Sequence, residues 1–297
     1  MFNGSIVALV TPFLNGAIDW ESLERLVAWH LESGTAGLAP CGTTGETPTL
    51  THEEHLQVVR RVKEWSKGKI PVMAGCGANS TAKTIELARD VLRAGADGLL
   101  VVTPYYNKPT QAGLINHYDL LAKAVKAPIV IYNVPSRTGV NILPPAVIEL
   151  AQRHKHIVAV KEASGVLDQA SQIAREAPGH LVILCGDDSL TLPMLAIGAR
   201  GVISVAANIA PVQVSSMVSA WDALDADKAR RLHLKLLPIF KTLFIETNPV
   251  PVKTALKLMG RITSCEVRSP LVAMSKSNEA ELTAALAACN IIEEAVR

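Results

Sequence analysis

Short apolar runs alternate along this chain with longer amphipathic segments. Eight of the runs have the length and the bounding residues of buried strands, and they cover residues 5–11, 37–40, 71–75, 98–103, 128–133, 157–162, 181–186 and 201–205. Helix-like segments lie between them at 20–33, 51–67, 80–94, 111–126, 144–153, 166–176 and 189–198. Eight strand–helix units in about 220 residues predict an α/β fold, a (β/α)8 TIM barrel.

Local signals mark several of these boundaries. Residues 51–54 (THEE) have the form of a capping box, and Ser80 is placed to cap the next helix. The segments GADG and GARG, which end at Gly98 and Gly201, predict similar turns from a helix into a strand. Asp188 precedes Ser189, so we expect it to start a helix rather than to bind Mg²⁺.

The C-terminal part of the sequence is typical of helices. From about Pro211 onward the chain has no strand candidate. We therefore expect a barrel over residues 1–225 and a C-terminal helical region over 226–297 that packs on it. A doubly wound sheet is the alternative, but residues 75–77 (GCG) lack the third glycine of a dinucleotide-binding G-x-G-x-x-G motif.

Composition narrows the class of protein. Of the 297 residues, 49% are hydrophobic and 19% are charged, which suffices for a large core. The net charge of only +2 gives no long-range field that would favour nucleic acid or an anionic membrane as a partner. No apolar stretch reaches the roughly 18 residues of a membrane span. Five cysteines without a CxxC pair or a secretory leader predict free thiols in a reducing cytoplasm.

Lys161 is the most informative residue because it ends the apolar run 157–160 (IVAV). A TIM barrel carries its chemistry at the C-terminal ends of its strands. Burial disfavours the charged form of an amine, and a neutral amine attacks a carbonyl carbon to form a Schiff base. The alternative is a lysine that extends its ammonium group to solvent.

Other strand ends add chemical partners for this amine. Residues 42–46 (GTTGE) bring two hydroxyls and backbone amides toward an anion such as a carboxylate. Tyr105 and Tyr106 follow the fourth strand, Tyr132 lies at the end of the fifth, and Arg137 comes soon after. These groups are the ones needed to hold a keto acid, attack its carbonyl group and move protons. A plain turn, packed tyrosines and a surface arginine are the alternatives.

No metal site is expected. His52 and His55 lie three residues apart, which is the wrong spacing for a zinc-binding H-E-x-x-H motif. Cys41, Cys76 and Cys185 fall near strand ends, but no histidine is placed to pair with them. We expect these cysteines to be small buried residues.

Four segments together carry a resemblance to a known family: residues 42–46 (GTTGE), 103–107 (TPYYN), 132–139 (YNVPSRTG) and 160–163 (VKEA). They resemble the dihydrodipicolinate synthase family, which belongs to the pyruvate-dependent class I aldolases, and the similarity extends over nearly the whole chain. The wider superfamily shares the lysine, the first tyrosine of the strand-five loop and a related glycine loop. The Thr-Thr pair, the Tyr-Tyr-Asn segment and Arg137 are the marks of this family within it.

The resemblance implies an aldol condensation of pyruvate with L-aspartate 4-semialdehyde, in the diaminopimelate route of lysine biosynthesis. Pyruvate would form a Schiff base with Lys161, and Thr43 and Thr44 would hold its carboxylate. Gly186 and the main chain near Ile203 would close the pocket. No metal or organic cofactor is implied.

The resemblance also implies roles for residues around the pyruvate site. Tyr132 would donate and accept protons, relayed through Thr43 to Tyr106, which would reach in from a neighbouring subunit. Arg137 would bind the carboxylate of the aldehyde. The family is usually a homotetramer built from two tight dimers.

A regulatory cleft for lysine is implied at Thr47, Pro48, His52, His55, Asn79, Lys83 and Tyr105. The position of Lys83 is a glutamate in feedback-inhibited relatives, where it pairs with the ammonium of the inhibitor. A cation at this position repels that ammonium. The sequence therefore predicts weak or absent inhibition by lysine.

Two alternatives stay open. Another pyruvate-dependent aldolase or lyase, acting on an acyl sugar acid or a keto-deoxy acid, needs room for a long polyol, which Arg137 and Tyr106 disfavour. A silent paralogue that only binds keto acids has no need of the complete set of Lys161, Tyr132 and Thr43.

Overall fold

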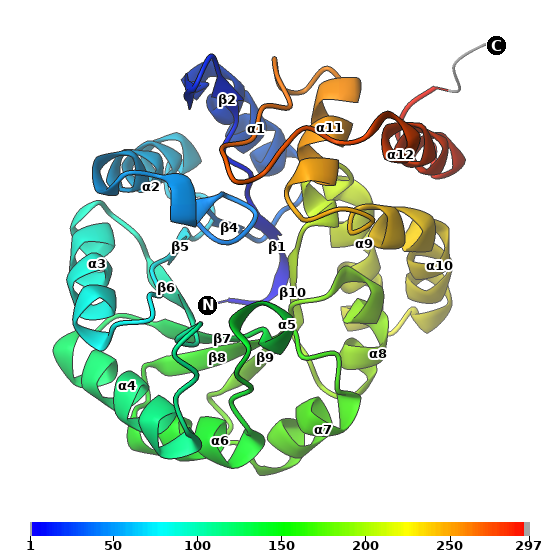
Figure 1. Ribbon diagram of the computed structural model, residues 1–297. Helices are drawn as coiled ribbons and strands as arrows, with labels where there is room; N and C mark the ends of the chain where they lie inside the picture. Colours follow the sequence, from blue (N-terminus) through cyan, green and yellow to red (C-terminus); the bar gives the residue numbers. More distant parts are fainter. Residues whose placement is uncertain (1, 294–297) are drawn as a thin grey trace.

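Eight parallel strands form a ring at the centre of the molecule, in a computed structural model that describes residues 2–293 (Figure 1). They are β1 (Gly4–Ala8), β4 (Gly37–Ala39), β5 (Met73–Gly75), β6 (Gly98–Val102), β7 (Ile129–Asn133), β8 (Ile157–Glu162), β9 (Val182–Cys185) and β10 (Gly201–Ser204). Their order is β4-β1-β10-β9-β8-β7-β6-β5, and a parallel bridge between Leu38 and Val72 joins the two ends. The predicted (β/α)8 barrel is confirmed.

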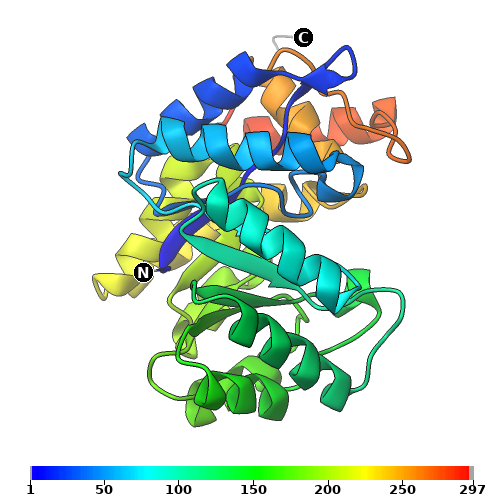
Figure 2. The ribbon, with the colours of Figure 1, turned by 90° about the vertical axis from the view of Figure 1, so that its left-hand side faces the viewer.

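The helices that follow the strands cover the outside of this ring. They are α1 (Trp20–Glu32), α2 (His52–Ser66), α3 (Thr81–Arg93), α4 (Gln111–Ala124), α6 (Pro144–Arg153), α7 (Leu167–Glu176), α8 (Thr191–Ala196) and α9 (Pro211–Asp222). Figure 2 shows α1, α2 and α3 side by side across one side of the barrel, and α2 packs on both of its neighbours. None of the helices in residues 2–293 has the length and apolarity that crossing a bilayer requires.

The local signals in the sequence act as predicted at three of these helices. Thr51 and Glu54 form both hydrogen bonds of the capping box at α2, and the Ser80 hydroxyl accepts from the Lys83 amide at the start of α3. Gly95 (φ 104°) and Gly198 (φ 108°) make the two similar turns from a helix into the next strand. A left-handed backbone of this kind favours glycine.

A helix begins at Asp188, as predicted, but the Asp188 side chain does not cap it. Asp187 supplies the cap, since its carboxylate accepts from the Ser189 amide, and the predicted helix 189–198 is divided into η2 (Asp188–Leu190) and α8. The Asp188 side chain turns inward, is 2% exposed, and accepts from the amides of Val205 and Ala206 at the end of β10. Burial raises its pKa to about 6.

Five short elements were not expected. A hairpin of β2 (Phe13–Leu14) and β3 (Ala17–Ile18) lies between β1 and α1. The one-turn helices η1 (Thr47–Thr49), α5 (Pro135–Thr138) and η3 (Ala206–Asn208) lie in the loops after β4, β7 and β10. Such elements are too short to produce a periodic pattern of apolar residues.

The C-terminal helices pack beside the barrel. They are α10 (Ala226–Thr242), α11 (Val250–Leu258) and α12 (Lys276–Ala288); α10 packs on α9, and α12 on α10 and α11 (Figure 1). A division of the chain at residue 225 stays a prediction, and residues 294–297 of the predicted C-terminal region lie outside the described residues.

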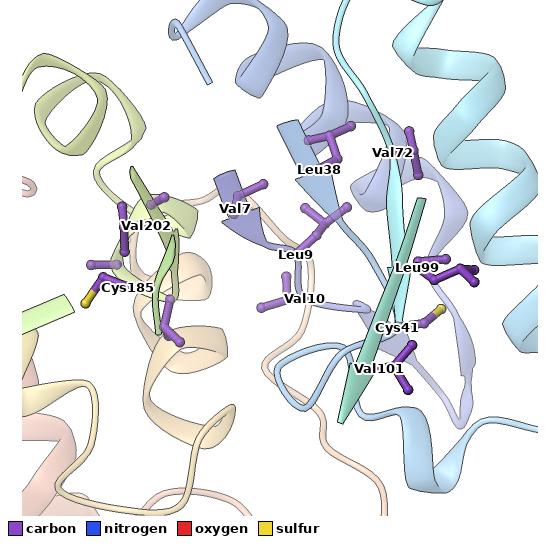
Figure 3. Packing of buried hydrophobic residues seen from close by; sticks show 14 of the residues in the cluster. Val7, Leu9, Val10, Leu38, Cys41, Val72, Leu99, Val101, Cys185 and Val202 are labelled. Atoms are coloured by element: carbon purple, nitrogen blue, oxygen red, sulfur yellow. The ribbon is translucent and has the colours of Figure 1, made fainter. Parts of the chain in front are cut away.

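The strands carry an apolar layer on each of their two faces. Figure 3 shows part of the layer between strands and helices, with Val7, Leu38, Val72 and Leu99. The second layer fills the barrel interior with side chains from alternate strand positions: Ile6, Ala8, Met73, Leu100, Val130, Tyr132, Ala159, Leu184 and Ile203. Because successive residues of a strand point to opposite faces, each strand has a fixed set of inward positions. Lys161 follows Ala159 in this set and therefore points into the barrel.

Candidate active site

A buried amine lies at the end of β8. Lys161 is 6% exposed, and its Nζ lies 4.1 Å from the centroid of the Tyr132 ring. The two residues are register partners on the adjacent strands β7 and β8. Among the described residues, no carboxylate lies within ion-pair distance of this amine. The site thus holds a buried amine beside a phenol, without a counter-ion.

A cavity of about 270 Å³ opens beside this pair. Tyr132 lines it together with Thr43 from the loop after β4 and Arg137 from α5. Cavities of this size accept small molecules, and a cationic guanidinium with a hydroxyl suits a carboxylate. The structure therefore brings the phenol, the hydroxyl and the guanidinium to one cavity. Lys161 does not line this cavity, and its amine is joined to the set through its contact with the Tyr132 ring.

Gly186, which follows the neighbouring strand β9, lies against the Lys161 side chain. A Cβ built on Gly186 would lie 3.1 Å from Lys161 Cε and 2.7 Å from Ala163 Cβ. Ile203 is 1% exposed and belongs to the interior layer that also contains Tyr132. A side chain at position 186 would thus press on both Ala163 and the Lys161 side chain, which a glycine avoids.

The loop that carries Thr43 and Thr44 is held from the C-terminal region. Thr44 is buried, and its Oγ1 accepts from Asn248 Nδ2 at 3.0 Å. Glu46 closes the loop with a left-handed backbone (φ 56°), and its carboxylate lies 2.6 Å from Lys253 Nζ on α11. Both members of this ion pair are buried. The C-terminal helices therefore take part in shaping the site.

Asn248 and Lys253 were missed as site-shaping residues by the sequence analysis. A signal existed, because Lys253 lies within the mostly apolar run 249–256 (PVPVKTAL), where an unpaired charge is unfavourable. Its partner Glu46 lies 207 residues earlier in the chain. Nothing in local sequence identifies a partner at that distance.

Tyr106 stands apart from the other predicted residues. Its side chain is 88% exposed and does not line the cavity. The backbone has φ 72°, and the Tyr106 amide donates to the Thr138 carbonyl at 3.3 Å, which fixes the segment against the loop after β7. Within a single chain, Tyr106 is therefore presented outward.

Five of the seven residues of the predicted regulatory cleft line two pockets. Thr47, Pro48 and Tyr105 line the cavity that Tyr132 also lines. His52 and Lys83 line a second pocket at the start of α2 and α3. Asn79 lines neither pocket, and its carbonyl accepts from Asn107 Nδ2 at 2.8 Å. His55 also lines neither pocket; it is buried, and burial lowers its pKa to about 4.

The cysteines near the strand ends lie in surroundings that disfavour the reactive thiolate. Cys41, Cys76 and Cys185 are buried, as predicted, and burial raises the pKa of each thiol. Within residues 2–293, no group of three or more histidine, cysteine or acidic side chains has an arrangement that could hold a metal ion.

Comparison with known proteins identifies the family. The model of the dihydrodipicolinate synthetase family matches residues 1–289. This chain belongs to that family. The resemblance inferred from the motifs is therefore confirmed.

Relatives match the chain over almost its full length. The 4-hydroxy-tetrahydrodipicolinate synthase of Geobacter sulfurreducens is 56% identical over 284 residues, covering 96% of this chain and 97% of the relative. The crystal structure of dihydrodipicolinate synthase from Aquifex aeolicus has 47% identity and a TM-score of 0.95, covering 98% and 99%. The chloride-inhibited synthase of Acinetobacter baumannii, in complex with pyruvate, has 43% identity and a TM-score of 0.96, covering 98% and 100%.

Proposed function

We propose that this protein is a lyase that condenses pyruvate with L-aspartate 4-semialdehyde to give 4-hydroxy-tetrahydrodipicolinate. The buried Lys161 amine, 4.1 Å from the Tyr132 ring and without a counter-ion in the described part of the chain, carries the proposal. The family and the names of its relatives support it. The product is the branch point towards diaminopimelate and lysine.

The chemistry begins with the amine. Lys161 attacks the C2 carbonyl of pyruvate, and loss of water from the carbinolamine leaves an iminium ion. Loss of a proton from C3 gives an enamine, whose C3 attacks the aldehyde carbon of the second substrate. The amino group of that substrate then attacks the iminium carbon, which closes the ring and releases Lys161. No metal or organic cofactor is needed for these steps.

Tyr132 is the proposed proton carrier. Its ring lies against Lys161, and Thr43 lines the same cavity. A phenol at this place is able to donate a proton as the carbinolamine loses water and to accept one as the enamine forms. Thr43 would pass the proton onward to Tyr106 of a neighbouring subunit.

The carboxylates of the two substrates have separate proposed partners. Thr43 and Thr44 hold the pyruvate carboxylate, with Gly186 and the main chain of Ile203 closing the other side. Arg137, exposed at the cavity wall, binds the carboxylate of the aldehyde. This arrangement leaves the reacting carbon atoms between the two anchors.

A homotetramer of two tight dimers is the proposed assembly. The outward position of Tyr106, 88% exposed in one chain, supports an interface that buries it against a second copy. Sedimentation velocity of the purified protein tests the assembly. A cytoplasmic location is proposed as well, supported by cysteines that form no disulfide within residues 2–293.

The Gly186→Ala variant tests the pyruvate site. We expect the added methyl group to displace the Lys161 side chain and to slow borohydride trapping of pyruvate by about 10- to 100-fold, because a misplacement of roughly 1 Å costs on that order. Gly179→Ala is the matched control, since nothing lies within 4 Å of a Cβ at that glycine. An unchanged trapping rate in Gly186→Ala would remove Gly186 from the site.

Lysine titration tests the regulatory cleft. With Lys83 exposed beside His52, we expect half-inhibition by lysine only above about 1 mM, a level that corresponds to ~4 kcal/mol of binding. Lys83→Glu removes the repelling cation, so inhibition should appear at lower concentration. Strong inhibition of the unaltered protein would contradict the prediction.

A coupled assay tests the substrate. The pyruvate concentration is held constant, and the turnover rate with aspartate semialdehyde is compared with the rate with sugar-derived aldehydes of the kind used by other pyruvate-dependent aldolases. Turnover that depends on aspartate semialdehyde supports the proposal. Turnover with a polyol aldehyde alone would move the activity to another lyase of the superfamily, and a trapped adduct without turnover of any aldehyde would leave a binding protein.

A further inference from the structure

A second buried ionisable group lies directly beside Lys161. Glu162 is the next residue of β8, and its side chain is 2% exposed. Its carboxylate accepts hydrogen bonds from the Ser164 amide (2.6 Å), Asn133 Nδ2 (3.0 Å) and Gln169 Nε2 (3.0 Å). In the described part of the chain, no lysine, arginine or histidine pairs with it. The carboxylate is therefore held by neutral donors alone.

Such an arrangement is unfavourable for stability by itself. Burial of a carboxylate costs several kcal/mol unless hydrogen bonds or a cation compensate for the lost hydration. A well-packed apolar residue at the same place would avoid this cost. The mechanism proposed above makes no use of the Glu162 side chain, so its presence requires another explanation.

The register of the strands gives that explanation. Tyr132 pairs with Lys161 across β7 and β8, and Asn133 pairs with Glu162 in the next row. Since neighbouring residues of a strand point to opposite faces, Tyr132 and Lys161 share the inner face, and Asn133 and Glu162 share the outer one. The Asn133–Glu162 hydrogen bonds thus fasten together the two strand ends that carry the amine and the phenol.

The same network reaches the loop that carries Arg137. Asn133 Oδ1 accepts from the Ile142 amide at 3.2 Å, and Asn133 Nδ2 also donates to Asn141 Oδ1 at 2.8 Å. Gln169 Nε2 donates to the Ile142 carbonyl at 3.2 Å. Both ends of the loop after β7 are therefore tied to Glu162, directly at Asn133 and through Gln169 at Ile142.

We propose that Glu162 is a positioning residue for the Lys161–Tyr132 pair. Through its hydrogen bonds, Glu162 fixes the position of the end of β8 relative to the end of β7. It thereby fixes the distance between the Lys161 amine and the Tyr132 phenol. The proposal rests on the proposed function, in which these two groups react with pyruvate. Groups that must transfer a proton need to be held to within a fraction of an ångström, and small errors there lower the rate steeply.

Glu162→Gln is the test, because it keeps the shape and changes one acceptor into a donor. Its amide nitrogen then faces a group that already donates, so one hydrogen bond is lost and the strand ends shift. We expect kcat to fall about tenfold or more at saturating pyruvate, with a similar fall in the rate of borohydride trapping. Glu149→Gln on α6, where the glutamate is only half-buried, is the matched control.

A comparison of kcat, KM and melting temperature separates positioning from a general loss of stability. A folded Glu162→Gln variant with an unchanged melting temperature, an unchanged KM for pyruvate and a lowered kcat supports the proposal, because a merely structural role predicts a lower melting temperature without a selective fall in kcat. If Glu162→Gln does not fold, Gln169→Met is read by the same two rates. It removes the hydrogen bonds of the Gln169 amide to Glu162, Asn141 and Ile142.

The outcomes are distinguishable from a failure of the proposed function. If the unaltered protein traps no pyruvate, the function itself is wrong. If the unaltered protein traps pyruvate and folded Glu162→Gln does so at the same rate with the same kcat, the positioning role of Glu162 is overturned.

Discussion

Replacing Lys161 by methionine is expected to abolish the pyruvate adduct and to lower kcat/KM by at least about 10²-fold, since removal of a covalent nucleophile is among the costliest changes to an enzyme. Methionine fills the buried space of the lysine stem without an amine. The fold should persist, because in the described residues no ion pair depends on Lys161.

The measurement is initial velocity in the coupled assay, together with a melting curve. Lys155→Met is the control, since Lys155 is exposed and lies just before the other end of β8. Loss of activity in Lys161→Met with an unchanged melting temperature identifies the amine as chemically required. Activity equal to that of the control would contradict the mechanism.

Replacing Lys253 by methionine is expected to destabilise the protein by about 3–5 kcal/mol, because it leaves the Glu46 carboxylate buried without its cation. Lys253 is fully buried, and its Nζ lies 2.6 Å from Glu46 Oε1 and 4.2 Å from the centroid of the Phe13 ring. Burial lowers the pKa of Lys253, and the charge of Glu46 opposes that shift. The second Glu46 oxygen accepts from the Arg268 amide at 3.0 Å.

Denaturant unfolding at fixed protein concentration gives the free energy of unfolding for this comparison. Lys257→Met on the same helix is the control, since Lys257 is exposed and makes no ion pair within residues 2–293. The double variant Lys253→Met/Glu46→Gln should recover part of the loss by removing the orphaned charge. A loss below about 1 kcal/mol, the scale of a surface ion pair, would contradict the account of a buried pair.

The strand pattern predicted the barrel well because the strands are apolar on both faces. The predicted strand 157–162 matches β8 at both ends, and the prediction 98–103 exceeds β6 by a single residue. Strands that are covered by helices on the outside and by side chains on the inside have continuous apolar sequences. Turn-forming residues on either side mark the ends of these runs clearly. The hairpin at Phe13 and Ile18 has only two residues in each strand, so no run marks it.

The site was predictable as a set of residue types but not as a set of partners. Lys161 and Tyr132 lie at the ends of predicted strands, Thr43 and Arg137 lie in the loops that follow such strands, and parallel strand ends meet at one face of a barrel. The pairs Glu46–Lys253 and Glu162–Asn133 are different, because each depends on how elements that are distant in the sequence pack together. Asp187 and Asp188 show that the same is true of neighbouring residues. Either carboxylate is suited to cap a helix, and only the position of β10 decides which of the two side chains points inward.

Borohydride trapping of the unaltered protein with pyruvate, followed by peptide mass analysis, tests the central claim most directly. A Schiff base reduced in place should add the mass of one pyruvic acid less one oxygen atom to the peptide that contains Lys161. This adduct at Lys161 alone is the predicted result. A protein that gains no such mass, or gains it at an exposed lysine, would contradict the assignment of Lys161 as the nucleophile.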